Sequence, residues 1–285
     1  MRTCSASGLR TRARSASPRP KLPEVAALWR TAFGRTAFGR AARVTAIFAG
    51  LLVAGPLLAA CGQGPSVNIH ASLPHSYAWK SSAKLGLWNT NGFDVFNNEW
   101  NQSQAGPQTI WADSYQRWGV VSKQPGSTSV KTYPCVQQNY HNPRLGSITS
   151  LSSTFAEEMP RASANYDAEA AYDMFLNSYH GEVMVWVDNH HQTPEGSVIS
   201  HAEISGRQYN VYHGTTHMFS FVLAGHQESA GHVNLLSALQ WLIRHHYFSD
   251  STKLTQVNFG FEIASTDGVP MNFTVTRFAL RTNAQ

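Results

Sequence analysis

Apolar and polar residues alternate with a period of two in two segments in the second half of the chain. Residues 179–188 place valines on one face of an extended strand and Glu182 on the other. Residues 257–268 repeat the pattern with larger side chains, and Glu262 lies opposite them. Each segment predicts a strand that buries one face and presents a carboxylate on the other. The apolar residues are Val183, Val185 and Val187, then Val257, Phe259, Phe261 and Ile263.

Short segments of similar character recur between Tyr77 and Leu280, separated by Gly, Pro, Asn and Ser. A stretch of roughly 200 residues is within the range of one large β domain. The pattern therefore predicts an all-β domain. The candidate strands are residues 83–87, 93–98, 109–113, 117–121, 130–133, 163–175, 182–188, 207–213, 217–223, 256–263 and 272–280.

One segment has a helical period instead. Between Val233 and Phe248, leucine and isoleucine recur at the spacing of one helix face. We expect a single helix that packs against the outside of a β sandwich, with Trp241 in a structural role. The residues of the apolar face are Leu235, Leu236, Leu239, Leu242 and Ile243.

The first 60 residues have the composition of a secretory leader. Residues 44–60 are apolar, contain Gly and Pro and follow several arginines, which favours a cleaved signal over a membrane span. The ending Leu58-Ala-Ala-Cys61 resembles a bacterial lipobox, which implies cleavage before Cys61 and a lipid on that cysteine. Residues 61–76 would then be the anchor and tether, and 77–285 the folded domain. The alternative is ordinary secretion, with Cys61 merely near the cleavage point. We expect a secreted or cell-surface protein that meets a membrane only through this anchor.

The charge of the chain changes sign once the leader is set apart. The whole chain has a net charge of +5. Residues 1–61 hold 10 of the 22 Lys and Arg and one of the 17 acids, so the remainder has 12 basic and 16 acidic residues, or −4. The folded part shows no basic stripe, which argues against a nucleic-acid partner.

Cysteine and histidine patterns predict neither disulfides nor a metal site. Cys4 lies in the leader, Cys61 is the candidate lipid site and Cys135 is alone, with no C-x-x-C spacing. None of the 13 histidines, including the pairs 190–191 and 245–246, lies in an H-E-x-x-H pattern. A G-x-S-x-G elbow is also absent, which argues against a Ser-His-Asp hydrolase.

Two acids and several tryptophans are the candidate chemistry. Glu182 and Glu262 each lie within a run of large apolar residues, and a buried carboxylate needs a partner or a catalytic role. Trp186 shares a face with Glu182, and Trp100 follows Asn98-Glu99, so we place both tryptophans in a groove. Two carboxylates beside aromatic faces suit cleavage of a glycosidic bond, because sugars stack on aromatic rings. Solvated or salt-bridged acids and core tryptophans are the alternative.

A series of motifs makes the chain resemble glycoside hydrolase family 12, the small endo-β-1,4-glucanases and xyloglucanases. The resemblance extends from about Gly86 to Leu280, and the motifs come in the family's order. They are Asn97-Asn-Glu-Trp100, Ser129-Val-Lys-Thr-Tyr-Pro134, Ala171-Tyr-Asp-Met-Phe175, Glu182-Val-Met-Val-Trp186, Thr193-Pro-Glu-Gly196, Phe219-Ser-Phe221 and Gly260-Phe-Glu-Ile263.

The resemblance implies a role for each matching residue. Glu182 falls at the family's nucleophile and Glu262 at its acid/base, while Asp173 matches the aspartate that hydrogen-bonds the nucleophile. The residues that match contacts to the glucan chain are Asn98, Trp100, Met184 and Trp186. The implied fold is a β-jelly roll of two curved antiparallel sheets with one helix on the convex side. The implied reaction uses no metal or organic cofactor.

We therefore expect a monomeric, retaining endo-β-1,4-glucanase that acts on cellulose or related β-glucans. A xyloglucan-specific enzyme is the first alternative, since the sequence does not show how the groove tolerates side chains on the polymer. A β-glucan-binding lipoprotein with poor turnover is the second, although a pure binder has no use for paired acids. A structural cell-envelope protein is the third.

Overall fold

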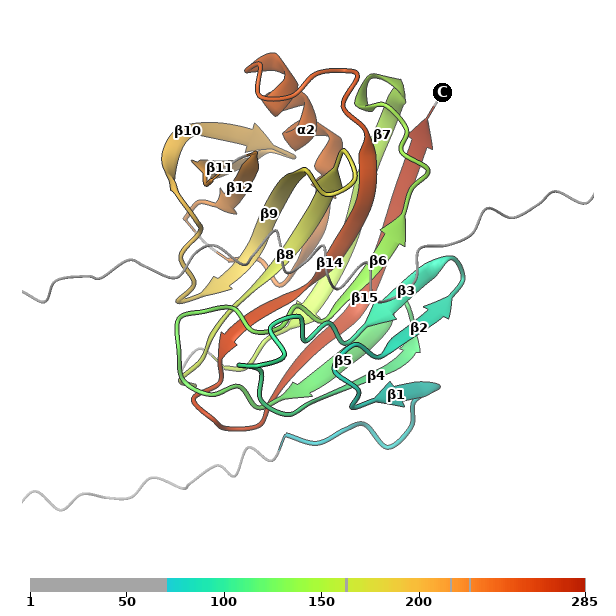
Figure 1. The fold of residues 1–285 in the computed structure, drawn as a ribbon, viewed down its shortest axis with the longest axis vertical. Coiled ribbons are helices and arrows are strands. Elements are labelled where there is room, and N and C mark those ends of the chain that lie inside the picture. The colour runs from blue at the N-terminus through green and yellow to red at the C-terminus, as the bar shows by residue number, and fades with distance from the viewer. Residues whose placement is uncertain (1–70, 162–163, 216, 226, 285) are drawn as a thin grey trace, which may run out of the picture.

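The computed structural model describes residues 71–284, except 162–163, 216 and 226 (Figure 1). The predicted leader, 1–60, and Cys61 lie outside the described residues. Of the predicted tether, only residues 71–76 are described, and they contain no helix or strand. None of the described helices is long and apolar enough to cross a membrane.

The described residues fold into two β-sheets that pack face to face (Figure 1). The six-stranded sheet has the order β1 (Trp79–Ser81), β4 (Gln108–Ser114), β5 (Arg117–Ser122), β15 (Met271–Ala284), β7 (Ile148–Glu158), β13 (Ala230–Asn234). The nine-stranded sheet has the order β10 (Ser197–Ile204), β11 (Arg207–His213), β12 (Met218–Leu223), β9 (Gly181–His190), β8 (Asp167–Leu176), β14 (Leu254–Ser265), β6 (Cys135–Asn139), β3 (Phe93–Phe96), β2 (Leu87–Thr90). The predicted all-β class is confirmed. The described pairings are antiparallel except that of β12 with β9, which is parallel.

The core between the sheets forms because alternate residues of each strand point toward the other sheet. Phe259 of β14 illustrates it: its ring lies 5.4 Å from that of Phe155 on β7 and 4.6 Å from that of Tyr172 on β8. Trp118 of β5 meets Phe261 in the same way, with ring centroids 5.9 Å apart. The valines of β9 and the large apolar residues of β14 all belong to this core. Their other faces therefore point away from the six-stranded sheet, on what we call the outer face of the nine-stranded sheet.

The helix α2 (Leu235–Arg244) confirms the helical period and covers part of the nine-stranded sheet. It begins after Asn234, whose side chain accepts a hydrogen bond from the backbone N–H of Ser237. Its apolar face joins the core, where Trp241 is buried and contacts Phe221 of β12 edge to face at 5.7 Å. The six-stranded sheet is too narrow to cover the whole nine-stranded sheet. The helix therefore covers the apolar side of β12, on the face of the nine-stranded sheet opposite the predicted site.

Several strand predictions were wrong. Gly86 donates its backbone N–H to the carbonyl of Ala83, so the predicted strand at 83–87 is a turn. In the predicted strand 130–133, only Thr132 forms a bridge, to Ile263. Six strands were not predicted: β1, β2, β6, β7, β10 and β13. The inward residues of β7 include Ser153 and Glu157, and much of the edge strand β10 is exposed, so neither shows a clean apolar alternation.

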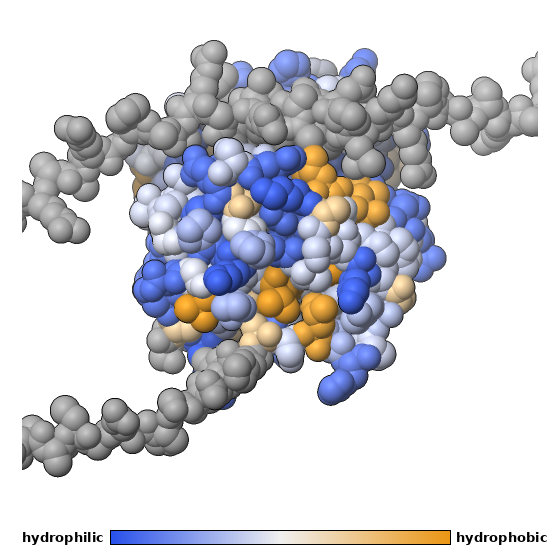
Figure 2. All heavy atoms as spheres, turned by 60° about the horizontal axis from the view of Figure 1, so that its bottom comes forward, coloured by the Kyte–Doolittle hydropathy of each residue, from blue (hydrophilic) through white to orange (hydrophobic). Residues whose placement is uncertain are grey.

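The end of the molecule seen in Figure 2, which is at the bottom of Figure 1, is mainly polar. Apolar residues form small groups there that polar residues separate. One exposed apolar side chain, Val269, lies in the turn that joins β14 to β15. Scattered apolar residues of this kind are normal on a protein surface.

A pair of carboxyl groups lies within the sandwich, away from the predicted site. Glu157 of β7 is buried and contacts Asp188 of β9. Burial, and then the charge and contact of Asp188, raise the pKa of Glu157 to about 9. Because two carboxylates have only acceptor oxygens, the contact is a hydrogen bond only while Glu157 keeps its proton. Folding therefore stabilises the protonated form of this residue.

We predict that the free energy of unfolding falls as the pH rises from about 5 to 9, and that Glu157→Gln reduces this slope. A carboxyl whose pKa is higher in the folded chain binds more protons there, so its contribution is complete below pH 4.5 and is lost as the pH approaches 9. One such group changes the stability by at most about 1.4 kcal/mol per pH unit. Urea unfolding at pH 5, 7 and 9 measures the slope. The exposed neighbour Glu158 supplies the control Glu158→Gln, and equal slopes for the two variants would contradict the assignment.

Candidate active site

Four carboxyl groups lie on the outer face of three adjacent strands. Glu182 is on β9, Asp173 and Glu169 are on the central strand β8, and Glu262 is on β14. The inward neighbours of each residue belong to the core, so alternation turns all four side chains outward. They are nevertheless covered, with Glu182 7% and Glu262 5% exposed and the other two fully buried.

Glu182 is the second residue of β9 and lies opposite Phe175. Its backbone N–H donates to the carbonyl of His217, which ties the start of the strand to β12. Burial, then the charges of Glu262 and Glu195, raise its pKa well above the ordinary value. Glu195 belongs to the Thr193-Pro-Glu-Gly196 motif, and its carboxylate accepts hydrogen bonds from the backbone N–H and hydroxyl of Thr215.

Asp173 lies between the two strands that carry the predicted catalytic pair. It is opposite Met184 of β9 on one side and Asn258 of β14 on the other. Its pKa is raised well above the ordinary value by burial, then by the charges of Glu182 and Glu262, and the Asn258 amide acts in the opposite direction. These causes favour a neutral Asp173 beside Glu182.

Glu262 and Glu182 are offset along the sheet. Glu262 lies opposite Glu169 and Glu182 opposite Phe175, six residues apart on β8 (175 − 169). A flat strand would separate those positions by about 20 Å. Strand β14 bends along its length (Figure 1), and the charge of Glu262 still contributes to the raised pKa of Glu182. The two carboxyls are therefore within electrostatic range of one another.

Glu169 is the acid that sequence reasoning missed. It lies directly opposite Glu262, and the two side chains are in contact. Its neighbours are alanines, so it does not stand out from a run of large apolar residues as Glu262 does. Its position could have identified it: Glu169 comes four residues before Asp173, and this even spacing places both side chains on one face of a strand.

The predicted sugar-contacting residues lie in two apolar clusters that are separate from the core between the sheets. Met184 and Trp186 pack with Ala171 and the partly buried Met218 and Val222. Trp100 packs with Phe96, Tyr133, Cys135 and Phe175 in the second cluster. Both tryptophans are mostly buried, and the Trp186 indole N–H has no hydrogen-bond partner among the described residues.

Asn98, the fourth predicted contact, is a buried residue with a left-handed backbone at φ 29°. Its backbone carbonyl accepts two hydrogen bonds, one from the backbone N–H of Tyr133 and one from the hydroxyl of Thr132. Its side-chain amide has no hydrogen-bond partner among the described residues. An amide held in this way can bind a polar ligand, because its donors and acceptor are not used within the fold.

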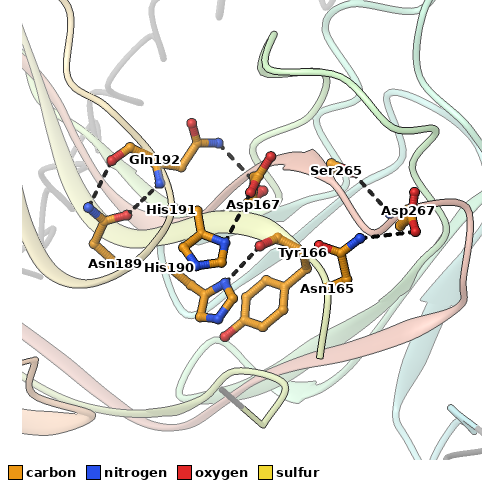
Figure 3. A network of polar contacts seen from close by, with 9 residues as sticks. All are labelled: Asn165, Tyr166, Asp167, Asn189, His190, His191, Gln192, Ser265 and Asp267. Carbon is orange, nitrogen blue, oxygen red and sulfur yellow. Dashed lines mark hydrogen bonds and ion pairs between the residues drawn. The ribbon is translucent and has the colours of Figure 1, made fainter. Parts of the chain in front are cut away.

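A polar network joins the ends of β8, β9 and β14 (Figure 3). One of its members, Asn189, lies opposite Glu169 in the sheet. His190 stacks on Tyr166 with ring centroids 3.9 Å apart and contacts its carbonyl through Nδ1. His191 lies 3.5 Å from Asp167, and Asn189 exchanges two hydrogen bonds with the backbone of Gln192. Within the described ranges, no three His, Cys, Asp or Glu residues are grouped so as to hold a metal ion.

The comparison with known families gives a direct answer. A profile described as "Glycosyl hydrolase family 12" matches residues 84–283, most of the chain. The chain belongs to glycosyl hydrolase family 12. It is therefore a glycoside hydrolase, of the endo-β-1,4-glucanase class.

The sequence and structure of the chain are also similar to those of individual family 12 members. A xyloglucan-specific endo-β-1,4-glucanase A from Emericella nidulans is 30% identical over 199 residues, which cover 62% of this chain and 82% of that protein. The xyloglucanase domain of NopAA, a type three effector from Sinorhizobium fredii solved with cellobiose, is 28% identical with a TM-score of 0.67. The alignment covers 73% of this chain and all of that domain.

The fold agrees with family 12 members at lower identity as well. The catalytic domain of Humicola grisea Cel12A, solved with a thio cellotetraose, has a TM-score of 0.66 at 20% identity, over 72% of this chain and 99% of that one. The predicted two-sheet jelly roll with one helix is thereby confirmed.

Proposed function

We propose that this family 12 member is a retaining endo-β-1,4-glucanase whose preferred polymer is xyloglucan. The observation that carries the mechanism is the placement of Glu182 and Glu262 on the outer face of the two strands that flank β8, with Asp173 between them. Retention needs one carboxylate that attacks and one carboxylic acid that donates a proton, and the two can be adjacent because their environments differ.

Glu182 is the proposed nucleophile and must be ionised to attack the anomeric carbon. Burial works against that charge, so a hydrogen-bond donor is required close by. Asp173 supplies it in this proposal: its raised pKa keeps it neutral, and a neutral carboxyl can donate to the Glu182 carboxylate.

Glu262 is the proposed acid/base. Burial raises its pKa, so it retains its proton where an exposed glutamate has lost it. In the first step Glu182 bonds to the anomeric carbon, the glycosidic C–O bond breaks, and the Glu262 proton goes to the leaving oxygen. In the second step Glu262 takes a proton from water, the resulting hydroxyl bonds to the anomeric carbon, and Glu182 is released.

The choice of polymer rests on relatives and on the surface beside the acids. The Emericella nidulans and Sinorhizobium fredii proteins are named as acting on xyloglucan, and both align with most of the folded domain. Met184 and Trp186 lie on the outer face and suit the apolar faces of a glucan chain, and the unpaired amide of Asn98 suits its hydroxyls. Unbranched β-1,4-glucan and mixed-linkage β-glucan are the competing substrates.

We predict that Glu182→Gln lowers the rate of polymer hydrolysis by about 10⁴-fold or more while glucan binding and the cooperative melt remain, because only the attacking oxygen is lost. Reducing-sugar release, affinity electrophoresis on glucan and a thermal melt measure the three properties. Glu158→Gln on β7 is the matched control. Loss of the cooperative melt would make Glu182 a structural residue, and a wild-type protein that binds but releases no sugar would favour a glucan-binding lipoprotein.

We also predict that initial rates of the wild-type protein are higher on xyloglucan than on carboxymethylcellulose or mixed-linkage β-glucan. Proton NMR of the first products should show the β anomer, as retention requires. A higher rate on either unbranched polymer would overturn the substrate assignment, and an initial α anomer would overturn the mechanism.

The leader supports a further proposal on location: the protein is exported and held at the membrane by a lipid on Cys61. Residues 44–60 and the lipobox-like Leu58-Ala-Ala-Cys61 support it. We predict that the protein made in a bacterial host fractionates with membranes and that Cys61→Ser releases it. Mass spectrometry of the N-terminal peptide measures the attached lipid. An unmodified, soluble wild-type protein would favour ordinary secretion.

A further inference from the structure

A second carboxyl group lies directly across the ladder from Glu262. Glu169 of β8 and Glu262 of β14 are opposite in an antiparallel pair, and both side chains are on the outer face. Cβ atoms of such a pair are about 4.5–5.5 Å apart, so two glutamates reach one another without rearrangement. Glu169 is completely buried, and its carboxyl contacts that of Glu262.

No described cation neutralises this pair. The ion pairs within the described residues are Arg117–Asp113, His191–Asp167 and Arg207–Glu228. Lys131 donates its backbone N–H to the carbonyl of Ile263, next to Glu262. Its Nζ instead contacts the hydroxyl of Ser127 and the carbonyls of Ser129 and Ala264. The other groups that face the pair are Asp173 on β8, Glu182 and Asn189 on β9 and Tyr133 before β6.

The contact therefore requires a proton. Neither oxygen of Glu169 has a hydrogen-bond donor from another described residue, and Glu262 Oε1 has none either. Two carboxylates offer only acceptors and repel one another, which is destabilising for directly opposite residues. One carboxyl must remain protonated for the two to stay together in the dry interior.

The surroundings favour Glu169 as the residue that keeps it. Burial, then the charge and contact of Glu262, raise the pKa of Glu169 well above the ordinary value. Burial also raises the pKa of Glu262, but there the contact with Glu169 acts in the opposite direction. Glu262 is the more exposed of the two, as a group that meets substrate and water must be.

We propose that Glu169 is a positioning residue that stays protonated throughout the reaction and donates a hydrogen bond to the acid/base Glu262. The proposal rests on the function proposed for Glu262. When Glu262 gives its proton to the leaving oxygen, the Glu169 hydroxyl stabilises the carboxylate that forms. That carboxylate then accepts the proton of the attacking water, and Glu169 ends the cycle with its own proton still in place.

The order of titration tests the proposal without any need for turnover. Carbon-13 NMR of the folded protein with labelled glutamate carboxyls follows each group as the pH changes, and Glu169→Gln and Glu262→Gln assign the two signals. As the pH rises, we expect Glu262 to lose its proton first. Across the pH range in which Glu262 ionises, the Glu169 signal should remain that of a protonated acid. A Glu169 signal that ionises before Glu262 would overturn the proposal.

Two substitutions at Glu169 test the hydrogen bond itself. Glu169→Gln keeps a neutral donor, so the alkaline limb of kcat/KM should stay within about half a pH unit of wild type. Glu169→Met fills similar space without a donor, and the limb should move about one to two units to higher pH, since a hydrogen bond to a charged group has that effect. The buried but distant Glu157→Gln is the control and should leave the limb unchanged.

Each other result has a definite reading. A shift to lower pH in Glu169→Gln would mean that Glu169 is normally charged, and wild-type limbs in both variants would mean that it does not act on Glu262; either overturns the proposal. If the Met variant does not fold, the titration order in the wild-type protein still decides. A wild-type protein with the expected titration order but no polymer hydrolysis would contradict the proposed function and leave the hydrogen bond standing.

Discussion

Burial of the apolar sides of β9, β8 and β14 against the six-stranded sheet is the constraint on which the site depends. Phe259 packs on Phe155 and Tyr172 across the sandwich, and the β9 valines occupy the same core. A slip of one residue in any of these strands would turn its apolar residues outward and its acid inward. The energy that holds the sandwich together therefore also holds Glu182, Asp173 and Glu262 on one face. The geometry of the proposed catalytic residues and the packing of the core are two results of one alternation.

The same arrangement makes ionisation of the site's carboxyl groups energetically unfavourable. Four carboxyls lie on adjacent strands with little exposure, and no described lysine or arginine forms an ion pair with them. Each charge that appears must be offset by a proton on a neighbour, because an isolated buried carboxylate is strongly disfavoured. Neutral Asp173 beside Glu182 and neutral Glu169 beside Glu262 would meet that need with one donor for each reacting group. The proton order is then a consequence of strand register, since register decides which acids are opposite.

The sequence predicted the parts of this structure that rest on simple periodicity. The strands around Glu182 and Glu262 and the helix from Leu235 alternate with clear periods, so their existence and buried faces follow directly. Strand β7 could not be predicted in this way, because two of its inward positions hold the polar residues Ser153 and Glu157. Their polar groups are paired with residues of other strands. Glu169 was missed for a related reason: its environment is made by Glu262, 93 positions later (262 − 169), and nothing local marks it. The burial of Trp100 likewise depends on Phe175 and Tyr133, which are distant in sequence.

Two carboxyl pairs lie on opposite sides of the nine-stranded sheet, and each combines a buried acid with a more exposed one. They differ in the side of the sheet on which they lie. Glu157 and Asp188 meet within the sandwich, where the shared proton only affects the stability of the fold. Glu169 and Glu262 meet on the outer face, where one member retains 5% exposure and the other none. In the proposed mechanism this asymmetry separates the roles within the pair: the exposed carboxyl exchanges its proton with substrate and water, while the buried one holds its proton and stabilises each charge that its partner acquires. In the proposed mechanism the side of the sheet therefore decides the role: the more exposed member of the outer pair faces the side on which Glu182 and Trp186 lie, whereas the pair within the sandwich does not.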